Sequence, residues 1–403
     1  MILWWKELVP ILLLIGALGV VVPMAIWSLE CAAALLPPRK RAPAANTRRP
    51  AVTVLVPAHN ESLVIGHTLA TLAPQMLSGD RVVVIADNCS DGTADIARRA
   101  GTLVLERHAP VLKGKSYALD YAVRSLRDNM AGVFVVIDAD CTVHPGAIDQ
   151  LTRLSFSTGR PVQANYLMEL PVNPSPLQPI AILAFRIKNF VRPSGLDRLG
   201  LPCFLNGSGM AFPSSMMQNA AWASGRTAED KWLTIDLILA GHAPLFCRDA
   251  KITSRLPGQK PAEISQSTRW LHGHLECMAA QGPRLLLGAV RQRRLDLLAM
   301  WLDFVVPPLT LLVMLWLAAL AATLAAGLLH FGWIPVIAVA GGGLFMALSV
   351  AGVIYRFEEK GVMQSLWAVP FYVVSKLPIY AAFILRRQRN WVRTERDPIR
   401  PSE

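Results

Sequence analysis

Three long runs without a single charged residue constrain this chain more than any other feature. They are Leu8–Leu29, Phe304–Leu329 and Phe331–Tyr355. A helix needs about 20 apolar residues to cross about 30 Å of hydrocarbon, and each run is long enough. Hydrophobic residues make up 53% of the 403 residues and charged residues only 17%, against about a quarter in soluble domains. These features exclude a disordered chain, a small disulfide scaffold and a purely soluble enzyme.

The first run could also be a cleavable signal peptide. Its hydrophobic stretch is too long for one, however, and neither a basic leading region nor a small-x-small cleavage site accompanies it. We therefore predict an N-terminal transmembrane helix with its flank over residues 1–38 and a basic juxtamembrane linker over 39–50. The C-terminal part, 284–403, is predicted to hold two further spans at about 304–329 and 331–355.

Basic residues predict the orientation, because loops rich in Lys and Arg stay on the cytoplasmic side. They follow the first run, precede the second and follow the third, at Arg39, Lys40, Arg41, Arg48, Arg49, Arg284, Arg291, Arg293, Arg294, Arg356 and Lys360. The turn around His330 has none. We expect a multi-pass protein of the inner (plasma) membrane, with the middle portion cytoplasmic and the N-terminus outside.

A fourth apolar stretch, Gly361–Leu385, is interrupted by Pro370, Lys376 and Pro378, and a basic tail follows it. Because both of its flanks are basic, we predict an interfacial or re-entrant segment on the cytoplasmic face, with a fourth span as the alternative. The net charge of +12, from 40 basic and 28 acidic residues, gathers at these membrane edges. Lipid headgroups are therefore the expected partner, and nucleic acid is not.

The six cysteines are scattered, with no CxxC pair and no Cys/His cluster. Neither a zinc site nor a disulfide framework is supported, and a reducing compartment fits the middle portion.

Residues 51–283 alternate short apolar runs with helical patterns. Strands are predicted at Val52–Val56, Arg81–Ala86, Thr102–Glu106 and Val133–Ile137, and helices from about Glu61, Gly92 and Lys115. This alternation predicts an α/β domain with a mostly parallel sheet. Ligands of such sheets bind at the carboxyl ends of strands. The polar residues at those ends are Asn60, Glu61, Asp87, Asp138 and Asp140.

Asp138 and Asp140 are two residues apart, so in extended backbone both carboxylates point the same way. Two carboxylates suit Mg²⁺ or Mn²⁺ and leave room for substrate phosphates. One alternative is a pair of solvated acids at a strand end. Another is a phosphatase of the haloacid dehalogenase type, whose DxDx[TV] motif Thr142 would complete. That class normally opens its domain with the motif, whereas two strand–helix units precede it here.

Further polar groups stand at predicted helix starts and on one helix face. Lys115 could reach a diphosphate together with backbone N–H groups, although such lysines are usually only solvated. Glu229 and Asp230 open a helix, where acids also suit the helix dipole. Gln266, Arg269 and Trp270 share a helix face, and could form a surface cation–π pair or hold a phosphate and a sugar ring.

The order Asp87, Asp138-x-Asp140, Glu229-Asp230 and Gln266-x-x-Arg269-Trp270 resembles the D, DxD, [TE]D, QxxRW signature of membrane-bound family-two glycosyltransferases. This group includes cellulose, chitin, hyaluronan and poly-N-acetylglucosamine synthases. The segments Val56–Glu61 and Lys113–Leu119 resemble two further motifs of the family, and the likeness covers about Thr53–Trp270. It implies a GT-A fold, in which a Rossmann-like, mostly parallel sheet is flanked here by transmembrane helices.

The resemblance also implies roles. Asp87 contacts the nucleotide base, for which we expect uracil, with Asn60 and Glu61 beside it. Asp138 and Asp140 line the diphosphate, and Asp140 is the direct metal ligand for Mg²⁺ or Mn²⁺. Lys115 supports the phosphates, and Asp230, next to Glu229, is the general base. The remaining residues hold the diphosphate and the acceptor sugar: Gln266, Arg269 and Trp270, and near the acceptor Asn206, Gly207 and Ser208.

The sequence departs from the family pattern in places. Ala228 stands where Thr often precedes the acidic pair, and the FxVTxKG gating motif of cellulose synthases is absent. Only three spans are predicted, fewer than a polysaccharide channel usually has, so association with other assembly or export proteins is expected if the product is secreted. The stretch Pro179–Val191 is predicted to be either an interfacial helix or a helix facing the domain core.

We therefore expect an inverting glycosyltransferase that moves a sugar from a nucleotide diphosphate donor, UDP-linked, to a lipid-linked or growing polysaccharide acceptor in exopolysaccharide assembly. A processive synthase of a β-linked glycan is one alternative. An inactive nucleotide-sugar-binding scaffold of an export complex is another.

Overall fold

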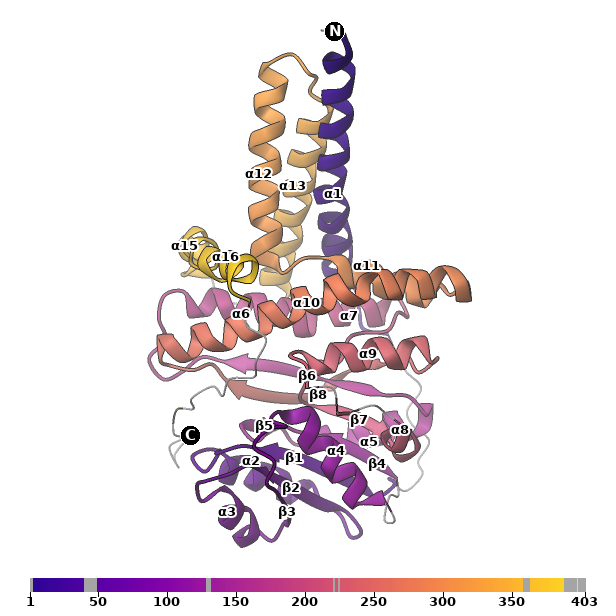
Figure 1. Ribbon diagram of the computed structural model, residues 1–403, viewed down its shortest axis with the longest axis vertical. Helices are drawn as coiled ribbons and strands as arrows, with labels where there is room; N and C mark the ends of the chain where they lie inside the picture. Colours follow the sequence, from indigo (N-terminus) through magenta and orange to yellow (C-terminus); the bar gives the residue numbers. More distant parts are fainter. Residues whose placement is uncertain are drawn as a thin grey trace.

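Three long helices stand side by side above an α/β domain in this computed structural model (Figure 1). The structure describes residues 3–39, 49–127, 132–219, 222–223, 225–357, 363–387 and 397. The upright helices are α1 (Leu3–Leu35), α12 (Leu309–Leu328) and α13 (Ile334–Arg356). By length and composition, four segments could cross a membrane: Leu8–Leu35, Leu309–Leu328, Ile334–Arg356 and Leu366–Leu385. The chain therefore has the helices that membrane association requires.

The second predicted run starts later than its composition suggests. Phe304 belongs to a separate helix, α11 (Leu295–Val305), and its ring stacks on Phe204 with centroids 5.0 Å apart. Pro307 and Pro308 follow, and α12 begins only at Leu309. Proline lacks the N–H that a helix interior needs, so the apolar run is divided between two helices.

The described part of the stretch Gly361–Leu385, residues 363–385, contains two short helices rather than one long one. After the 3₁₀ turn Leu366–Ala368, α15 (Val369–Ser375) and α16 (Leu377–Leu385) are separated at Lys376. Both lie across the foot of α12 (Figure 1). The Tyr380 hydroxyl lies 2.6 Å from Thr310 Oγ1 at the start of α12, and His272 Nε2 lies 2.9 Å from the Ile379 carbonyl oxygen. These contacts hold the segment at one end of the bundle.

The domain is built on an eight-stranded sheet in the order β3-β2-β1-β4-β7-β6-β8-β5. The strands are β1 (Val52–Ala58), β2 (Arg81–Asp87), β3 (Leu103–Arg107), β4 (Val133–Val136), β5 (Cys141–Val143), β6 (Val162–Glu169), β7 (Met210–Pro213) and β8 (Leu245–Arg255). The first four are parallel, β7 is antiparallel to both β4 and β6, and β5 is antiparallel to β8. The predicted α/β class with a mostly parallel sheet is confirmed.

Helices cover both faces of this sheet. Successive side chains of β1 alternate, so Val54 and Val56 join one buried cluster while Leu55 joins another. The first cluster includes residues of α2 (Ile65–Leu72), α3 (Thr93–Arg99) and α5 (Ala147–Thr158). The second includes residues of α4 (Lys115–Ser125), α8 (Ser214–Asn219) and α9 (Glu229–Leu239). Packing on both faces holds the sheet rigid, and with it the carboxyl ends of the parallel strands.

A layer of helices separates the sheet from the upright bundle (Figure 1). It consists of α6 (Gln178–Arg186), the π-helix η3 (Ile187–Val191), α7 (Arg192–Arg198) and the long α10 (Lys260–Gln292). Ile180 and Leu183 of α6 belong to one hydrophobic cluster with Trp27 of α1 and Phe246 of β8. The stretch Pro179–Val191 thus lies between the domain and the foot of the bundle, with several apolar side chains buried and Lys188 exposed, a position intermediate between the two alternatives predicted for it.

Ion pairs also cross this layer. Arg192 of α7 donates to Glu30 of α1 at 2.5 Å and pairs with Asp303 of α11. The same α10 runs through position 283, the predicted end of the domain, to Gln292. The domain and the upright helices therefore share a hydrophobic core.

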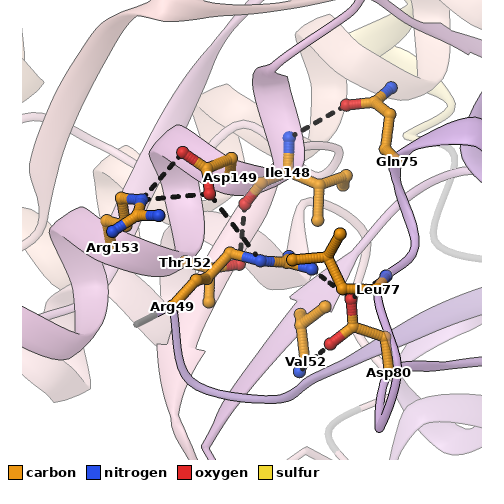
Figure 2. Close-up of polar contacts among 9 residues, drawn as sticks. All are labelled: Arg49, Val52, Gln75, Leu77, Asp80, Ile148, Asp149, Thr152 and Arg153. Atoms are coloured by element: carbon orange, nitrogen blue, oxygen red, sulfur yellow. Dashed lines mark hydrogen bonds and ion pairs between the residues drawn. The ribbon is translucent and has the colours of Figure 1, made fainter. Parts of the chain in front are cut away.

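Arg49 does not belong to a lipid-facing basic flank, and that prediction is wrong. Its side chain is only 2% exposed, pairs with Asp80 and lies 3.7 Å from an oxygen of Asp149. Figure 2 shows it between the two acids. Asp80 also accepts hydrogen bonds from the amides of Val52 and Leu77, so the guanidinium holds the start of β1 in the domain. Lys40, Arg41 and Arg48 lie outside the described residues, as do Lys360 and the tail after 387 except Asp397.

Candidate active site

A cavity of about 230 Å³ opens at the carboxyl ends of β1, β2 and β4. Most of the residues predicted for the site line it, although they lie far apart in the chain: Glu61, Asp87, Lys115, Asp138, Asp140, Asn206, Gly207, Glu229, Asp230, Gln266, Arg269 and Trp270. Two predicted residues, Asn60 and Ser208, are not among the lining residues. The parallel half of the sheet thus brings its acids to the edge where ligands of such folds bind.

The loops after β1 and β2 are joined to each other. Asn60 adopts a left-handed conformation with φ of 55°, and its Oδ1 accepts a hydrogen bond from the Ser90 amide at 2.7 Å. The Glu61 amide donates to Thr93 Oγ1 at 2.9 Å. Asn60 therefore connects two loops, and Glu61 and Asp87 face the cavity.

Asp87 is buried and held by Arg107, whose Nη1 lies 2.5 Å from its Oδ1. Burial raises the pKa of Asp87 above its usual value, although the Arg107 guanidinium opposes the shift. The carboxylate is therefore oriented before any ligand arrives. Asp91, which follows the same strand, accepts hydrogen bonds from the amides of Thr93 and Ser62 and does not line the cavity.

Asp138 and Asp140 both line the cavity, but not because the backbone is extended. β4 ends at Val136, and residues 139 and 140 form a turn in which the Cys141 amide donates to the Asp138 carbonyl at 3.2 Å. The predicted extended geometry is therefore wrong. The turn directs Ala139 into the core and leaves the two flanking carboxylates at the cavity.

Lys115 connects the turn after β4 with the turn Asn206–Gly209. Its ammonium pairs with Asp138 and donates to the Gly207 carbonyl oxygen at 2.8 Å. Burial lowers the pKa of Lys115, but the negative charges of Asp138 and Glu229 outweigh it and the net shift is upward. The lysine is thus a fixed positive charge beside the acids of the cavity.

The turn Asn206–Gly209 requires glycine. Gly209 has φ of 71°, and a Cβ there would lie 2.5 Å from the Ala164 Cβ. Ser208 is fully buried, and its Oγ accepts a hydrogen bond from the Asp138 amide at 3.1 Å. Ser208 thus orients the Asp138 turn, while Asn206 and Gly207 reach the cavity.

The acidic pair Glu229-Asp230 begins α9, directly after Ala228, which has φ of 61°. Burial, and secondly the negative charge of Asp230, raise the pKa of Glu229 to about 7. A Cβ on Gly207 would lie 3.9 Å from an Asp230 carboxylate oxygen and 3.9 Å from Lys115 Nζ. Both acids also raise the pKa of Lys115, so both lie near the lysine that contacts Asp138.

Helix α10 contributes the amide, guanidinium and indole of Gln266, Arg269 and Trp270 to the same cavity. The Trp270 ring lies 5.7 Å from Phe185 of α6, which in turn lies 5.7 Å from Tyr166 of β6, centroid to centroid. These rings form an aromatic wall, a surface that suits the apolar face of a sugar.

Several lining residues were not predicted: Tyr166, Phe185, Lys188, Asn189, Arg226 and Lys231. Lys188 and Asn189 lie in the π-helix, a distortion that is frequent at functional sites but has no clear sequence signal. Asn189 is 1% exposed, and its Oδ1 has no hydrogen-bond partner among the described residues. Lys231 could have been suspected, because it directly follows Asp230.

Within the described ranges, no group of three or more His, Cys, Asp or Glu side chains could enclose a metal ion. The available donors are oxygens of Asp138 and Asp140, and Asp140 Oδ2 accepts a hydrogen bond from Ser254 at 3.0 Å. Two carboxylates at an open cavity suit Mg²⁺ or Mn²⁺ when substrate phosphates supply further ligands.

Comparisons with known proteins agree with this arrangement. The family model described as glycosyltransferase like family 2 matches residues 50–273, more than half of the chain. The probable glycosyltransferase YdaM of Bacillus subtilis is 35% identical over 107 residues, and protein MJ1222 of Methanocaldococcus jannaschii is 29% identical over 102. Each match spans 25% of this chain, and covers 25% of YdaM and 40% of MJ1222.

Among solved structures, the mannosyltransferase PcManGT of Pyrobaculum calidifontis, in complex with GDP-Man and Mn²⁺, superposes with a TM-score of 0.55. It is 18% identical, and the match covers 95% of this chain and 100% of the other, so the likeness extends to the fold as a whole. The family match over residues 50–273 carries the assignment. The chain belongs to glycosyltransferase family 2.

Proposed function

We propose that this glycosyltransferase moves a sugar, with inversion, from a UDP-linked or similar nucleotide diphosphate donor to a hydroxyl of a lipid-linked or growing polysaccharide acceptor. One observation carries the proposal: acids from three strand ends and the start of α9 line one cavity with Lys115 among them. Separate acidic clusters would not support it.

The donor half of the site is the edge formed by β1, β2 and β4. Asp87 and Glu61 lie where the nucleoside would bind, with Asn60 holding their loops together. Lys115 and Arg269 lie where cations would attract the diphosphate, because a charge-assisted hydrogen bond to phosphate is strong in a partly buried site. Gln266 is buried beside them.

Asp140, with Asp138, would hold Mg²⁺ or Mn²⁺. A divalent cation bound there neutralises negative charge on the departing diphosphate. PcManGT, which shares the fold, binds GDP-Man and Mn²⁺, so this architecture is compatible with a cation beside a nucleotide sugar. Asp138 already contacts Lys115, which offers the diphosphate a second positive charge.

The acceptor half lies toward α9 and α10. In the proposed step the acceptor oxygen bonds to the anomeric carbon, the bond from that carbon to the diphosphate oxygen breaks, and the hydroxyl proton passes to the Asp230 carboxylate. Asn206, Gly207 and Trp270 would position the acceptor, and Glu229 adds negative charge next to the base. The leaving group departs as a nucleoside diphosphate.

The test is a screen of nucleotide sugars against the purified full chain, scored by hydrolysis or transfer. With the active donor, Asp230→Asn should lower kcat by about 10²–10⁴-fold and keep nucleotide binding. The matched control is Asp236→Asn, since Asp236 lies exposed on the same helix and pairs with Arg284. Equal turnover by Asp230→Asn and Asp236→Asn would refute the role of Asp230. Nucleotide-sugar binding by wild type without any turnover would favour the inactive scaffold instead.

Product length then separates the remaining alternatives. A single addition to a defined acceptor excludes a processive β-glycan synthase. A long product made by this chain alone would exclude the single-addition mode.

A further inference from the structure

A second cavity, of about 190 Å³, lies between the candidate active site and the foot of the bundle. Its walls come from elements that meet there: Trp27 of α1, Leu196 of α7, Val306 and Leu309 around the start of α12, and Tyr372 of α15. Most of these side chains are apolar, and they belong to helices long and apolar enough to cross a membrane or adjoin such helices. We call this cavity the basal groove.

The basal groove and the candidate active site share a wall. Phe185, Lys188, Asn206, Lys231 and Trp270 line both. An elongated molecule could therefore occupy the groove and extend past the Trp270 indole toward Asp230.

The shared wall carries two lysines, Lys188 and Lys231. Within the part of the chain that the structure describes, neither Lys188 nor Lys231 forms an ion pair with a carboxylate. Each ammonium group lies near an aromatic ring, Lys188 at 6.0 Å from the Phe185 centroid and Lys231 at 5.6 Å from the Phe204 centroid, and the Asp230 carboxylate attracts both without an ion pair. The neighbouring Arg192, by contrast, is paired with both Glu30 and Asp303.

Two neighbouring lysines in a protein-lined cavity are unfavourable without an anion. Lys188 is exposed within the cavity and Lys231 is buried. Partial removal from water, and then the charge of Lys231, lower the pKa of Lys188, and burial lowers the pKa of Lys231, although the Asp230 carboxylate opposes both shifts. His274, which lines the groove, has its pKa lowered by burial and by the same lysines. An anionic group bound between the lysines would remove this repulsion.

We propose that the basal groove binds the acceptor as a membrane lipid with a phosphate in its head group. In this proposal the alkyl chain of the lipid lies among the apolar residues of the basal groove. The phosphate of the lipid lies between Lys188 and Lys231, and a hydroxyl of the head group beyond the phosphate reaches Asp230. The argument rests on the proposed transferase function and narrows its acceptor to an amphiphile with a phosphate. Free polysaccharide lacks an alkyl chain and therefore does not match the apolar half of this surface.

Binding of dodecyl phosphate to the purified full chain tests the proposal without requiring turnover. Dodecyl phosphate should bind at least tenfold tighter than dodecanol and than inorganic phosphate, because each of those lacks one half of the ligand. Lys188→Gln should weaken dodecyl phosphate binding about tenfold, whereas Lys188→Arg keeps the charge and restores it. Lys251→Gln, at an exposed position on β8, is the matched control and should have no effect.

A second variant tests the apolar half. Ala184 lines the basal groove but not the active-site cavity, so Ala184→Trp should fill the groove, weaken dodecyl phosphate and leave nucleotide affinity unchanged. Ala280→Trp, at an exposed position on α10, is its control. Equal affinity for dodecyl phosphate and inorganic phosphate would overturn the lipid assignment, and so would an unchanged affinity in both Lys188→Gln and Ala184→Trp. If the wild type binds dodecyl phosphate but turns over no nucleotide sugar, the transferase function is contradicted and lipid binding is not.

Discussion

Glu229 and Asp230 place two carboxylates next to each other at the start of α9, and burial together with the charge of Asp230 raises the pKa of Glu229. Because the folded-state pKa of Glu229 is about 7 instead of 4.5, the folded protein keeps this proton over a pH range in which the unfolded chain has lost it. Folding stability therefore falls as pH rises from about 4.5 to about 7, and above that range the full penalty is present.

Glu229→Gln removes that penalty. At pH 8 the free energy of unfolding of the variant should exceed that of wild type by about 1–3 kcal/mol, so the variant should also unfold at a higher temperature. At pH 5 this difference should be smaller. Thermal unfolding of both proteins at the two pH values is the measurement. A difference that does not change with pH would show that Glu229 is ionised throughout.

The two acids of the β4 turn give a separate prediction. If Asp140 holds the cation, Asp140→Asn and excess EDTA should each reduce sugar transfer at least a hundredfold, because departure of a diphosphate depends on charge neutralisation. Added Mg²⁺ or Mn²⁺ should restore the EDTA-treated wild type but not the variant. Undiminished transfer in EDTA would contradict the metal assignment.

For single residues, the sequence predicted the chemical groups of the site well and their geometry poorly. Acids that directly follow strands could be predicted to meet, because parallel strands end at one sheet edge. The turn at Ala139 could not, since two acids separated by one residue look alike in a strand and in a turn. Arg49 resembled its basic neighbours in sequence, and only its approach to Asp80, far along the chain, distinguishes it.

Among the elements, the first four strands were predictable and the last four were not. β1 to β4 alternate with helices, and this regular alternation identifies a parallel sheet. β5 and β7 contain only three and four residues, and β6 is buried at seven of its eight positions, so none shows an alternating pattern. The π-helix was also missed, because its residues continue the apolar periodicity of α6.

The segment made by α15 and α16 gives a prediction about topology. The two helices contain seven and nine residues, and each is shorter than the roughly 20 needed to cross the bilayer. We predict that Met363 and Leu385, both exposed, lie on the same side of the membrane.

Single cysteines at these positions, in a Cys89→Ser background, should both react with a membrane-impermeant maleimide added from the cytoplasmic side. Cys89 is replaced because it is the one natural cysteine that is not fully buried. Reaction at one position only would establish a fourth span.

For the whole molecule, the most consequential interaction is the buried group Glu30–Arg192–Asp303, which joins α1, α7 and α11. Removing the shared cation leaves two acids uncompensated, so Arg192→Met should destabilise the protein by about 3–5 kcal/mol. Replacing all three residues by apolar ones of similar size should recover most of that loss.

The control is Arg284→Met, which breaks an ion pair about half exposed on both sides and should cost less than about 1 kcal/mol. Unfolding in the same detergent compares the variants. Equal effects of Arg192→Met and Arg284→Met would mean that the buried group does not join the helices.

Helix α1 does more than anchor the chain, because Trp27 lines the basal groove and Glu30 pairs with Arg192. A chimera with a foreign anchor in place of residues 3–35 would still be delivered to the bilayer. It would nevertheless lack one side of the compartment beneath the bundle and the carboxylate that restrains Arg192. Such a chimera should keep its affinity for the nucleotide but lose selectivity among acceptors.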